Sequence, residues 1–322
     1  MAELISIIIP IYNKQRFIRK CLQSVLNQTY PNTEVIIIDD CRTDNSYEIC
    51  KQAAETDSKI RLYQNRENIG HLRTRYIGIQ KSKSNWITFV DADDWLENDA
   101  ISRLYENAVD LDVDMVQMRH QRRMKGVAVK YYETFDSQLC GRKICSDEFY
   151  DLISYVGMDS HISPSCWGKL YKTELLKEAD RLNFNQFWGE DQIFNINYLR
   201  KARSLAIIDY IGYNYRWGGE TSNYKFTMLE EYKNVHNMKR LMGQNIDCLN
   251  REIIILLRYH IRQLITELGW TPKAISSIMQ DEIKDPIWKR AGLEESIDDI
   301  IEQEYEDVQK SHFKYIVKRL LK

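Results

Sequence analysis

Three short apolar runs, each ending at acidic or turn-forming residues, constrain the fold of this chain more than any other feature. They read SIIIP at 6–10, EVIIIDD at 34–40 and WITFVDADD at 86–94. Continuous runs rich in β-branched residues are typical of strands buried on both faces. The stretches at 16–27, 46–56 and 72–81 carry helical periodicity between them. Strands that alternate with helices predict an α/β fold with a mostly parallel sheet.

Five aspartates follow the second and third runs directly: Asp39, Asp40, Asp91, Asp93 and Asp94. Ligands of parallel sheets bind beyond the carboxyl ends of the strands, which is where these side chains are expected. Crowded carboxylates resist ionisation unless a cation compensates them. A solvated turn is one explanation. Mg²⁺ or Mn²⁺ held together with phosphate oxygens explains two converging acidic clusters better.

Composition excludes several classes of protein. The 322 residues, 43% of them hydrophobic, suffice for one large domain, or for one domain with a helical appendix. The net charge of −2 provides no basic field, so we expect no nucleic acid partner. Seven scattered cysteines indicate free thiols in a reducing compartment, and Cys140 and Cys145 lack the partners of a zinc site.

The amino-terminal apolar run is too short to span a membrane, and no basic stretch precedes it. We therefore expect no signal peptide and a cytoplasmic protein.

The common phosphate-binding loops are missing from the chain. Neither GxGxxG nor GxxxxGK[ST] occurs, which argues against dinucleotide-binding and P-loop enzymes, and no histidine lies in HExxH. A metal-dependent nucleotide site without a glycine loop remains. In such a site we expect an arginine to help bind the phosphates. The segment RTRYIG at 73–78 offers two arginines, and we expect Arg75 rather than Arg73 to point inward.

Four ordered segments resemble the family 2 glycosyltransferases of the GT-A fold. They are SIIIPIYN, IIIDDCRTDNS, NIGHLRTRYIG and FVDADDW, within about the first 100 residues. The chain is similar in particular to bacterial members that build capsule, O-antigen and lipooligosaccharide chains. The resemblance continues more weakly through CWGKLYK and WGEDQIF and fades after about residue 225. It implies a Rossmann-like sheet flanked by helices.

The resemblance implies a nucleotide site at the first two strand ends. Pro10 and Tyr12 would flank the uracil of a UDP-sugar, with the Tyr12 ring as a stacking face. A strand stop and a half-buried aromatic ring are the alternative. Asp40 would hydrogen-bond the base, supported by Asp39, and Arg75 would fix the base or a nearby phosphate.

The stretch Asp91-Ala92-Asp93-Asp94 resembles the DXD-type motif of the family. Asp91 would hold the ribose, and Asp93 would coordinate the divalent ion that bridges the diphosphate. Asp94 would contact the sugar or cap the helix expected to begin near 97–99.

An acceptor site is expected from the second half of the chain. Glu190 and Asp191 match the ED motif of the family, in which the aspartate is the base that removes the acceptor proton. Glu190 would orient Asp191 or bind the acceptor. Alternatively, both acids are helix N-terminal charges, a role that is compatible with catalysis.

Aromatic and basic residues around the ED motif complete the prediction. Trp167 and Trp188 are candidates for stacking on an acceptor sugar, with core packing as the alternative. For Lys169 we expect a surface position more than a diphosphate contact. Arg216 or Trp217, beside a Gly-Gly pair, could close over the donor.

After residue 225 the pattern becomes helical. We expect a catalytic domain at 1–225 and a helical extension at 226–322. The acidic run 293–307 predicts a helix with a solvated face, whose Ile297, Ile300 and Ile301 point inward. The tail HFKYIVKRLLK places apolar residues on one face and basic residues around the other. It either docks on the protein or forms a peripheral contact with an anionic membrane.

The resemblance to family 2 glycosyltransferases, together with these patterns, implies an inverting, metal-dependent transferase. It would move a hexose or N-acetylhexosamine, galactose first, from a UDP-sugar to a saccharide or lipid-linked glycan acceptor. A nucleotide-sugar-forming nucleotidyltransferase is one alternative, although PIYNKQRF replaces the basic glycine loop that such an enzyme carries after its first strand. A catalytically silent sugar-binding protein on the same fold is another.

Overall fold

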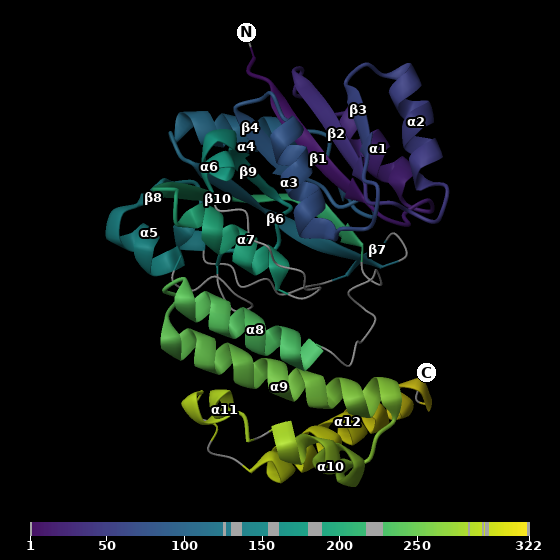
Figure 1. Cartoon of the computed structure of the whole chain (residues 1–322), viewed down its shortest axis with the longest axis vertical. Coiled ribbons are helices and arrows are strands. Elements are labelled where there is room, and N and C mark those ends of the chain that lie inside the picture. The colour runs from purple at the N-terminus through teal and green to yellow at the C-terminus, as the bar shows by residue number, and fades with distance from the viewer. Residues whose placement is uncertain are drawn as a thin grey trace. The chain divides into compact units, whose positions relative to one another are not determined.

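A computed structural model of the chain divides into two compact units, residues 1–222 and 223–322. The structure describes residues 2–124, 127–129, 137–153, 161–179, 189–216, 228–282, 284–291, 293 and 296–320. Among the described residues, the first unit holds the sheet and the predicted site residues, and the second unit is helical (Figure 1).

The described strands of the first unit form one mixed sheet in the order β3-β2-β1-β4-β9-β6-β10-β5, with β7 beside β6 and β8 beside β10. The strands β1, β2, β3 and β4 run parallel, whereas β9 pairs antiparallel with both β4 and β6. Their bounds are β1 Ile5–Ile11, β2 Thr33–Asp39, β3 Ile60–Gln64, β4 Trp86–Phe89, β5 Trp95–Leu96, β6 Met115–Met124, β7 Val127–Val129, β8 Ile144–Cys145, β9 Lys169–Lys172 and β10 Ser204–Arg216.

Helices flank this sheet as the alternating pattern predicts (Figure 1). They are α1 Ile18–Leu26, α2 Ser46–Thr56, α3 His71–Lys81, α4 Ala100–Asp110, the 3₁₀ turn η1 Ser137–Leu139, α5 Ser146–Ile153, α6 Thr173–Glu178 and α7 Glu190–Leu199. Alternate residues of β1 face opposite ways: Ile5, Ile7 and Ile9 join the core cluster with α1 and α4, and Ile8 contacts α3.

Gly78 lets α3 approach β1 closely. A Cβ atom at this position would lie 2.4 Å from Cγ2 of Ile8, which is inside van der Waals contact. The close approach holds α3 against the sheet, and Arg75 lies on the same helix three residues before Gly78.

The sequence predicts the early elements well and misses others. The strand β3 was not predicted because only Ile60 in IRLYQ is fully buried, so no apolar run marks it. Pro10 was expected to stop β1, but it lies inside the strand and pairs with Ile38. The strand β9, inserted antiparallel, is formed by KLYK, the end of the CWGKLYK segment, which periodicity alone did not identify as a strand.

The second unit consists of packed helices over its described residues. They are α8 Met228–Leu241, α9 Ile246–Leu268, α10 Pro272–Glu282, α11 Pro286–Arg290 and α12 Ile297–Leu320. The helix α9 packs on α8 and α12, and α10 packs on α12. Ile300 and Ile301 are fully buried and Ile297 is nearly so, which confirms the predicted inward face of the acidic run. None of the described helices is long and apolar enough to cross a membrane.

Candidate active site

The predicted acidic residues follow the carboxyl ends of neighbouring parallel strands. Asp39 ends β2 and Asp40 follows it, while Asp91 and Asp93 come just after β4. Because β1 lies between β2 and β4, both acidic clusters open onto the same edge of the sheet. Adjacent strands are about 4.8 Å apart, so the clusters lie within reach of one nucleotide-sized ligand.

Asp40 organises the loop that enters α3. Its carboxylate accepts hydrogen bonds from the side chain of Asn65 and from the backbone N–H groups of Ile69 and Gly70, each at 2.9 Å. Gly70, with φ of 87°, precedes the first residue of α3. The second strand thereby sets the position of the helix that carries Arg75.

Asp39 is fully buried, and only one of its two carboxylate oxygens accepts a hydrogen bond. Its Oδ2 accepts from Nε2 of Gln64 at 2.9 Å, but Oδ1 has no hydrogen-bond partner. Burial raises the pKa of Asp39 above its ordinary value, and Gln64 and Arg42 oppose that shift. An unpaired buried oxygen is costly in a fold, and a ligand that donates a hydrogen bond to it would remove that cost.

Pro10 and Tyr12 lie at the end of β1. Pro10 is buried within the strand, and Tyr12 is half-buried just beyond it. The ring of Tyr12 therefore keeps some accessible surface beside the acidic edge. Its stacking role stays a prediction.

Arg75 joins carboxylates from distant parts of the chain. Its side chain is 4% exposed, with Nη2 3.0 Å from Oδ1 of Asp91 and Nη1 2.9 Å from Oδ1 of Asp191. Oε1 of Glu190 lies 3.5 Å from Nη1. The inward orientation predicted for Arg75 is confirmed. Its predicted contact with the base or a phosphate is not what this geometry favours, because both terminal nitrogens already bind carboxylates.

The titration of this cluster reflects its burial. Burial raises the pKa of Asp91, Arg75 opposes the shift, and Asp191 and Asp93 add to it. Burial likewise raises the pKa of Glu190 to about 7, against the opposing charge of Arg75. Glu190 can therefore exchange a proton near neutral pH, which is a property of catalytic carboxylates.

Asp191 is held from two sides. Besides Arg75, the backbone N–H of Cys166 donates to its Oδ2 at 3.1 Å and the Cys166 thiol donates to its Oδ1 at 3.2 Å. It also lies in the first turn of α7, where the helix dipole favours a negative charge. Sequence reasoning missed Cys166, although the residue directly precedes the WGK stretch.

Asp93 faces a lysine that sequence reasoning missed as well. Nζ of Lys14 lies 2.8 Å from Oδ2 of Asp93, and both side chains are largely buried. The signal was available, because Lys14 directly follows PIYN at the end of β1.

The acidic edge fits a divalent ion shared with phosphate oxygens. No three His, Cys, Asp or Glu side chains cluster as metal ligands within the described residues. In that same part of the chain, one oxygen each of Asp91 and Asp93 accepts no hydrogen bond. Two hard oxygen donors are what Mg²⁺ or Mn²⁺ takes from a protein when a diphosphate and water supply the rest.

Asp94 has a structural position in the FVDADDW turn. It is 1% exposed, and its oxygens accept from the hydroxyl of Tyr213 at 2.8 Å and from the N–H of Arg216 at 2.7 Å. The capping role predicted for it is wrong, because α4 begins at Ala100 and Asp99 precedes it. The sugar contact is disfavoured too, since both oxygens are buried and bonded. Ala92 is also buried, at 1% exposure.

Arg216 is bound to the acidic turn that follows β4. Its Nε donates to the backbone oxygen of Asp93 at 2.8 Å, and its guanidinium lies over the rings of Phe17 and Trp95. Arg216 thus ties the end of β10 to the acidic turn. Trp217 lies outside the described residues.

The aromatic acceptor prediction is corrected for Trp167. Its ring is 8% exposed, lies 4.3 Å from the ring of Tyr213 at a 10° interplanar angle, and also contacts Tyr215 and His120. The stacking is therefore with protein rings rather than with a sugar. Trp188 lies outside the described residues.

The surface position predicted for Lys169 is also wrong. Lys169 is fully buried, and its Nζ donates to the backbone oxygens of Ser163 at 2.9 Å and Ser165 at 2.5 Å. It holds the segment that leads into Cys166.

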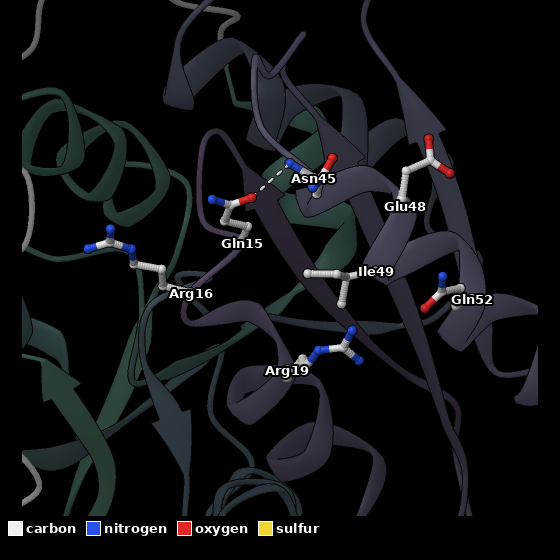
Figure 2. A pocket seen from close by; sticks show the side chains of 7 residues that line it. All are labelled: Gln15, Arg16, Arg19, Asn45, Glu48, Ile49 and Gln52. Carbon is white, nitrogen blue, oxygen red and sulfur yellow. Dashed lines mark hydrogen bonds between the residues drawn. The ribbon is translucent and has the colours of Figure 1, made fainter.

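A separate groove of about 460 Å³ runs between α1 and α2 (Figure 2). Its lining residues are Gln15, Arg16, Arg19, Asn45, Glu48, Ile49 and Gln52. Gln15 accepts a hydrogen bond from the N–H of Asn45 across one end. None of the aspartates discussed above lines this groove, so it is distinct from the carboxylate site.

Comparison with known proteins identifies the architecture around these carboxylates. The sequence model described as Glycosyl transferase family 2 matches residues 6–172, just over half of the chain. The chain belongs to glycosyltransferase family 2.

Two similar glycosyltransferases come from Streptococcus pneumoniae serotype 4. Glycosyltransferase GlyA is 32% identical over 213 residues, which cover 66% of this chain but only 30% of GlyA. Glycosyltransferase GlyG is 30% identical over 219 residues, covering 67% of this chain and 71% of GlyG. This family 2 chain therefore spans less than a third of one relative and most of the other.

A solved structure supports the GT-A-like fold of this family 2 glycosyltransferase. S. aureus TarS 1-349 in complex with UDP-GlcNAc superimposes with a TM-score of 0.60 at 18% identity, covering 89% of this chain and 79% of TarS 1-349. At that identity the likeness extends to the fold.

Proposed function

We propose that this chain is an inverting, metal-dependent glycosyltransferase of bacterial surface polysaccharide or lipooligosaccharide synthesis. It transfers a hexose or N-acetylhexosamine from a UDP-sugar to a saccharide acceptor. The observation that carries the proposal is the single guanidinium of Arg75, which contacts Asp91 from the donor-side motif and Asp191 from the ED motif. A donor held by Asp91 therefore lies next to a base supplied by Asp191.

Asp191 acts as the base. Its Oδ2 accepts one backbone N–H and keeps a further lone pair for the acceptor hydroxyl, and its side chain is 26% exposed. The hydroxyl loses its proton to Asp191 as its oxygen attacks the sugar C1 from the side opposite the diphosphate. Glu190, adjacent and also bound to Arg75, orients the acceptor or Asp191.

The donor lies along the carboxyl edge of β1, β2 and β4. Tyr12 stacks on the base, while Asp39 and Asp40 hold its polar edge; the unpaired Oδ1 of Asp39 supports this placement. Asp91 accepts from the ribose hydroxyls. Asp93 would hold Mn²⁺ or Mg²⁺, which when bound neutralises charge on the leaving diphosphate.

UDP-galactose is the first donor to try, and UDP-GlcNAc is the second because the TarS structure contains it. The decisive experiment is a screen of UDP-galactose, UDP-GlcNAc, UDP-GalNAc and UDP-glucose for UDP release with Mn²⁺ or Mg²⁺. We expect release with one donor above the others. An absence of both release and UDP binding across the set would contradict the proposal.

The carboxyl-terminal region is proposed as an extension that keeps the enzyme near its acceptor. The helix α12 continues to Leu320, and the sequence of its last turns is basic and apolar. We place the enzyme at the cytoplasmic face of the membrane, with a lipid-linked glycan as acceptor.

A further inference from the structure

Arg75 occupies a position that a nucleotide-binding arginine would not need. It is nearly fully buried, and its two terminal nitrogens divide their contacts between Asp91 on one side and Asp191 with Glu190 on the other. A buried guanidinium is tolerated only when carboxylates and hydrogen bonds compensate for its lost hydration. Burial by itself would lower the pKa of Arg75, but the surrounding acids, Asp191 foremost, raise it well above its ordinary value.

The contacts of Asp191 leave it little freedom to rotate. Oδ1 accepts from Nη1 of Arg75 at 2.9 Å and from the thiol of Cys166 at 3.2 Å, and Oδ2 accepts from the N–H of Cys166 at 3.1 Å. The side-chain amide of Asn195 donates to its backbone oxygen at 2.8 Å. The carboxylate is thus oriented before any acceptor arrives, which is what efficient proton removal requires.

We propose that Arg75 is a positioning residue that acts through Asp191. Cys166 is its partner, with the thiol on the same oxygen as Arg75 and the backbone N–H on the other oxygen. The inference rests on the proposed function, in which Asp191 is the base. Arg75 also fixes Asp91, so one guanidinium sets the distance between the donor-side carboxylate and the base. Neither Arg75 nor Cys166 needs to touch the nucleotide in this role.

The planar fork of arginine suits this task and a lysine ammonium does not. The fork places Nη2 on Asp91 and Nη1 on Asp191 at once, whereas one ammonium on a flexible stem is a single point charge. Arg75→Lys therefore keeps the positive charge among the three acids and removes the simultaneous contact. This substitution separates positioning from simple charge compensation.

The test compares Arg75→Lys with the matched control Arg73→Lys two residues away on α3. We expect Arg75→Lys to lower kcat about 100-fold, because a misplacement of the base by about 1 Å costs that much. The donor KM and the UDP dissociation constant by calorimetry should stay within about threefold of wild type, since the lost interaction belongs to the transition state. Arg73→Lys should leave kcat, the donor KM and the UDP dissociation constant unchanged.

The double variant Arg75→Lys with Asp191→Asn makes the test specific. If Arg75 acts through Asp191, adding Arg75→Lys to Asp191→Asn should lower the residual rate no further. Effects that multiply, or a loss of UDP binding in Arg75→Lys equal to its loss of kcat, would overturn the inference.

Cys166→Ala removes the thiol and keeps the backbone N–H, so we expect a smaller fall in kcat, with Cys50→Ala as the control for a lost buried thiol. An equal fall in kcat in both cysteine variants would remove Cys166 from the proposal.

These results are distinguishable from failure of the proposed function itself. Wild type that turns over no UDP-sugar would refute the function. In that case the Arg75–Asp191 coupling can still be measured from the unfolding midpoints of the two single variants and the double variant. Additive midpoints would refute the positioning contact as well.

Discussion

Nη1 of Arg75 lies 2.9 Å from Oδ1 of Asp191, although the two residues are 116 positions apart in the chain. The contact joins α3, which packs on the parallel strands, to the amino-terminal end of α7. Parallel strands, helix packing and an antiparallel insertion all have to form before the two side chains meet. The candidate active site is therefore a product of the whole first unit.

Asp191→Asn should separate binding from chemistry. The amide keeps the shape of the carboxylate but is not a base, so we expect transfer to fall by about 10²–10⁴-fold. UDP binding measured by calorimetry should persist. Asp209→Asn, on an exposed acid paired with Arg119, is the control and should keep full turnover. Unchanged transfer by Asp191→Asn would exclude it as the base.

Lys14→Met should strengthen binding of a divalent ion in the absence of nucleotide. The ammonium of Lys14 occupies the carboxylate of Asp93, so a metal ion and Lys14 compete there. Removing one positive charge about 4 Å from a divalent ion at high dielectric is worth about 2 kcal/mol, which changes the affinity about 30-fold. Titration with Mn²⁺, followed by electron paramagnetic resonance, measures the change. Lys51→Met on the exposed face of α2 is the control, and a weaker affinity in Lys14→Met would contradict the competition.

Glu190 should make the protein less stable as the pH rises toward 8. Its pKa is raised from 4.5 to about 7 by burial, so its favourable contribution is full below about pH 4.5 and disappears as the pH passes 7. The loss amounts to about 3 kcal/mol at most. Thermal unfolding between pH 5 and 8 should therefore show a smaller decline for Glu190→Gln than for wild type. Glu106→Gln, on the exposed side of α4, should decline as wild type does, and identical curves for all three proteins would refute the assignment.

Tyr213→Phe should destabilise the first unit. The hydroxyl donates to Asp94 at 2.8 Å and accepts from the N–H of Asp91 at 3.1 Å, so its removal leaves two buried groups unsatisfied. We expect a loss of about 1–3 kcal/mol in the free energy of unfolding by denaturant titration. Tyr210→Phe, whose hydroxyl bonds the more exposed Asp99, should cost less. A larger loss in the control would show that Asp94 is not the anchor.

The basic tail should contribute to membrane binding. Replacing Lys314, Lys318, Arg319 and Lys322 together with Gln removes its positive charge, and each charge contributes about 1 kcal/mol to binding an anionic surface. Co-sedimentation of the full chain with vesicles rich in phosphatidylglycerol should fall relative to wild type, and neutral vesicles serve as the control. Equal sedimentation with both vesicle types would favour docking of the tail on the protein.

Local pattern was sufficient for most of the parallel half of the fold. The Ile-rich strands β1 and β2 and the helices α2 and α3 were predicted nearly to the residue, because burial on both faces leaves a continuous apolar signature. The strand β3 has one fully buried residue in five and was missed. A half-exposed edge strand carries too weak a pattern for prediction.

Side-chain environment was harder to predict. From the sequence, we expected Lys169 at the surface, yet its ammonium is buried and donates hydrogen bonds to two backbone oxygens. From the sequence, Trp167 was a candidate for stacking on a sugar, yet its ring stacks on the rings of Tyr213 and Tyr215. The rings around Trp167 come from a distant strand, whereas the oxygens around Lys169 lie only four and six residues earlier and converge on it because of the backbone path.

The sequence by itself determined which residues carry charge at the ends of the buried strands, because strand termination and acidic composition are local properties. It also determined the family, through four ordered motifs. Only the tertiary structure decided the use of each charge: Asp94 bound to Tyr213, Asp93 paired with Lys14, and Arg75 shared between Asp91 and Asp191. The reason is physical, since the ionisation and orientation of a buried carboxylate depend on partners that the fold brings from far along the chain.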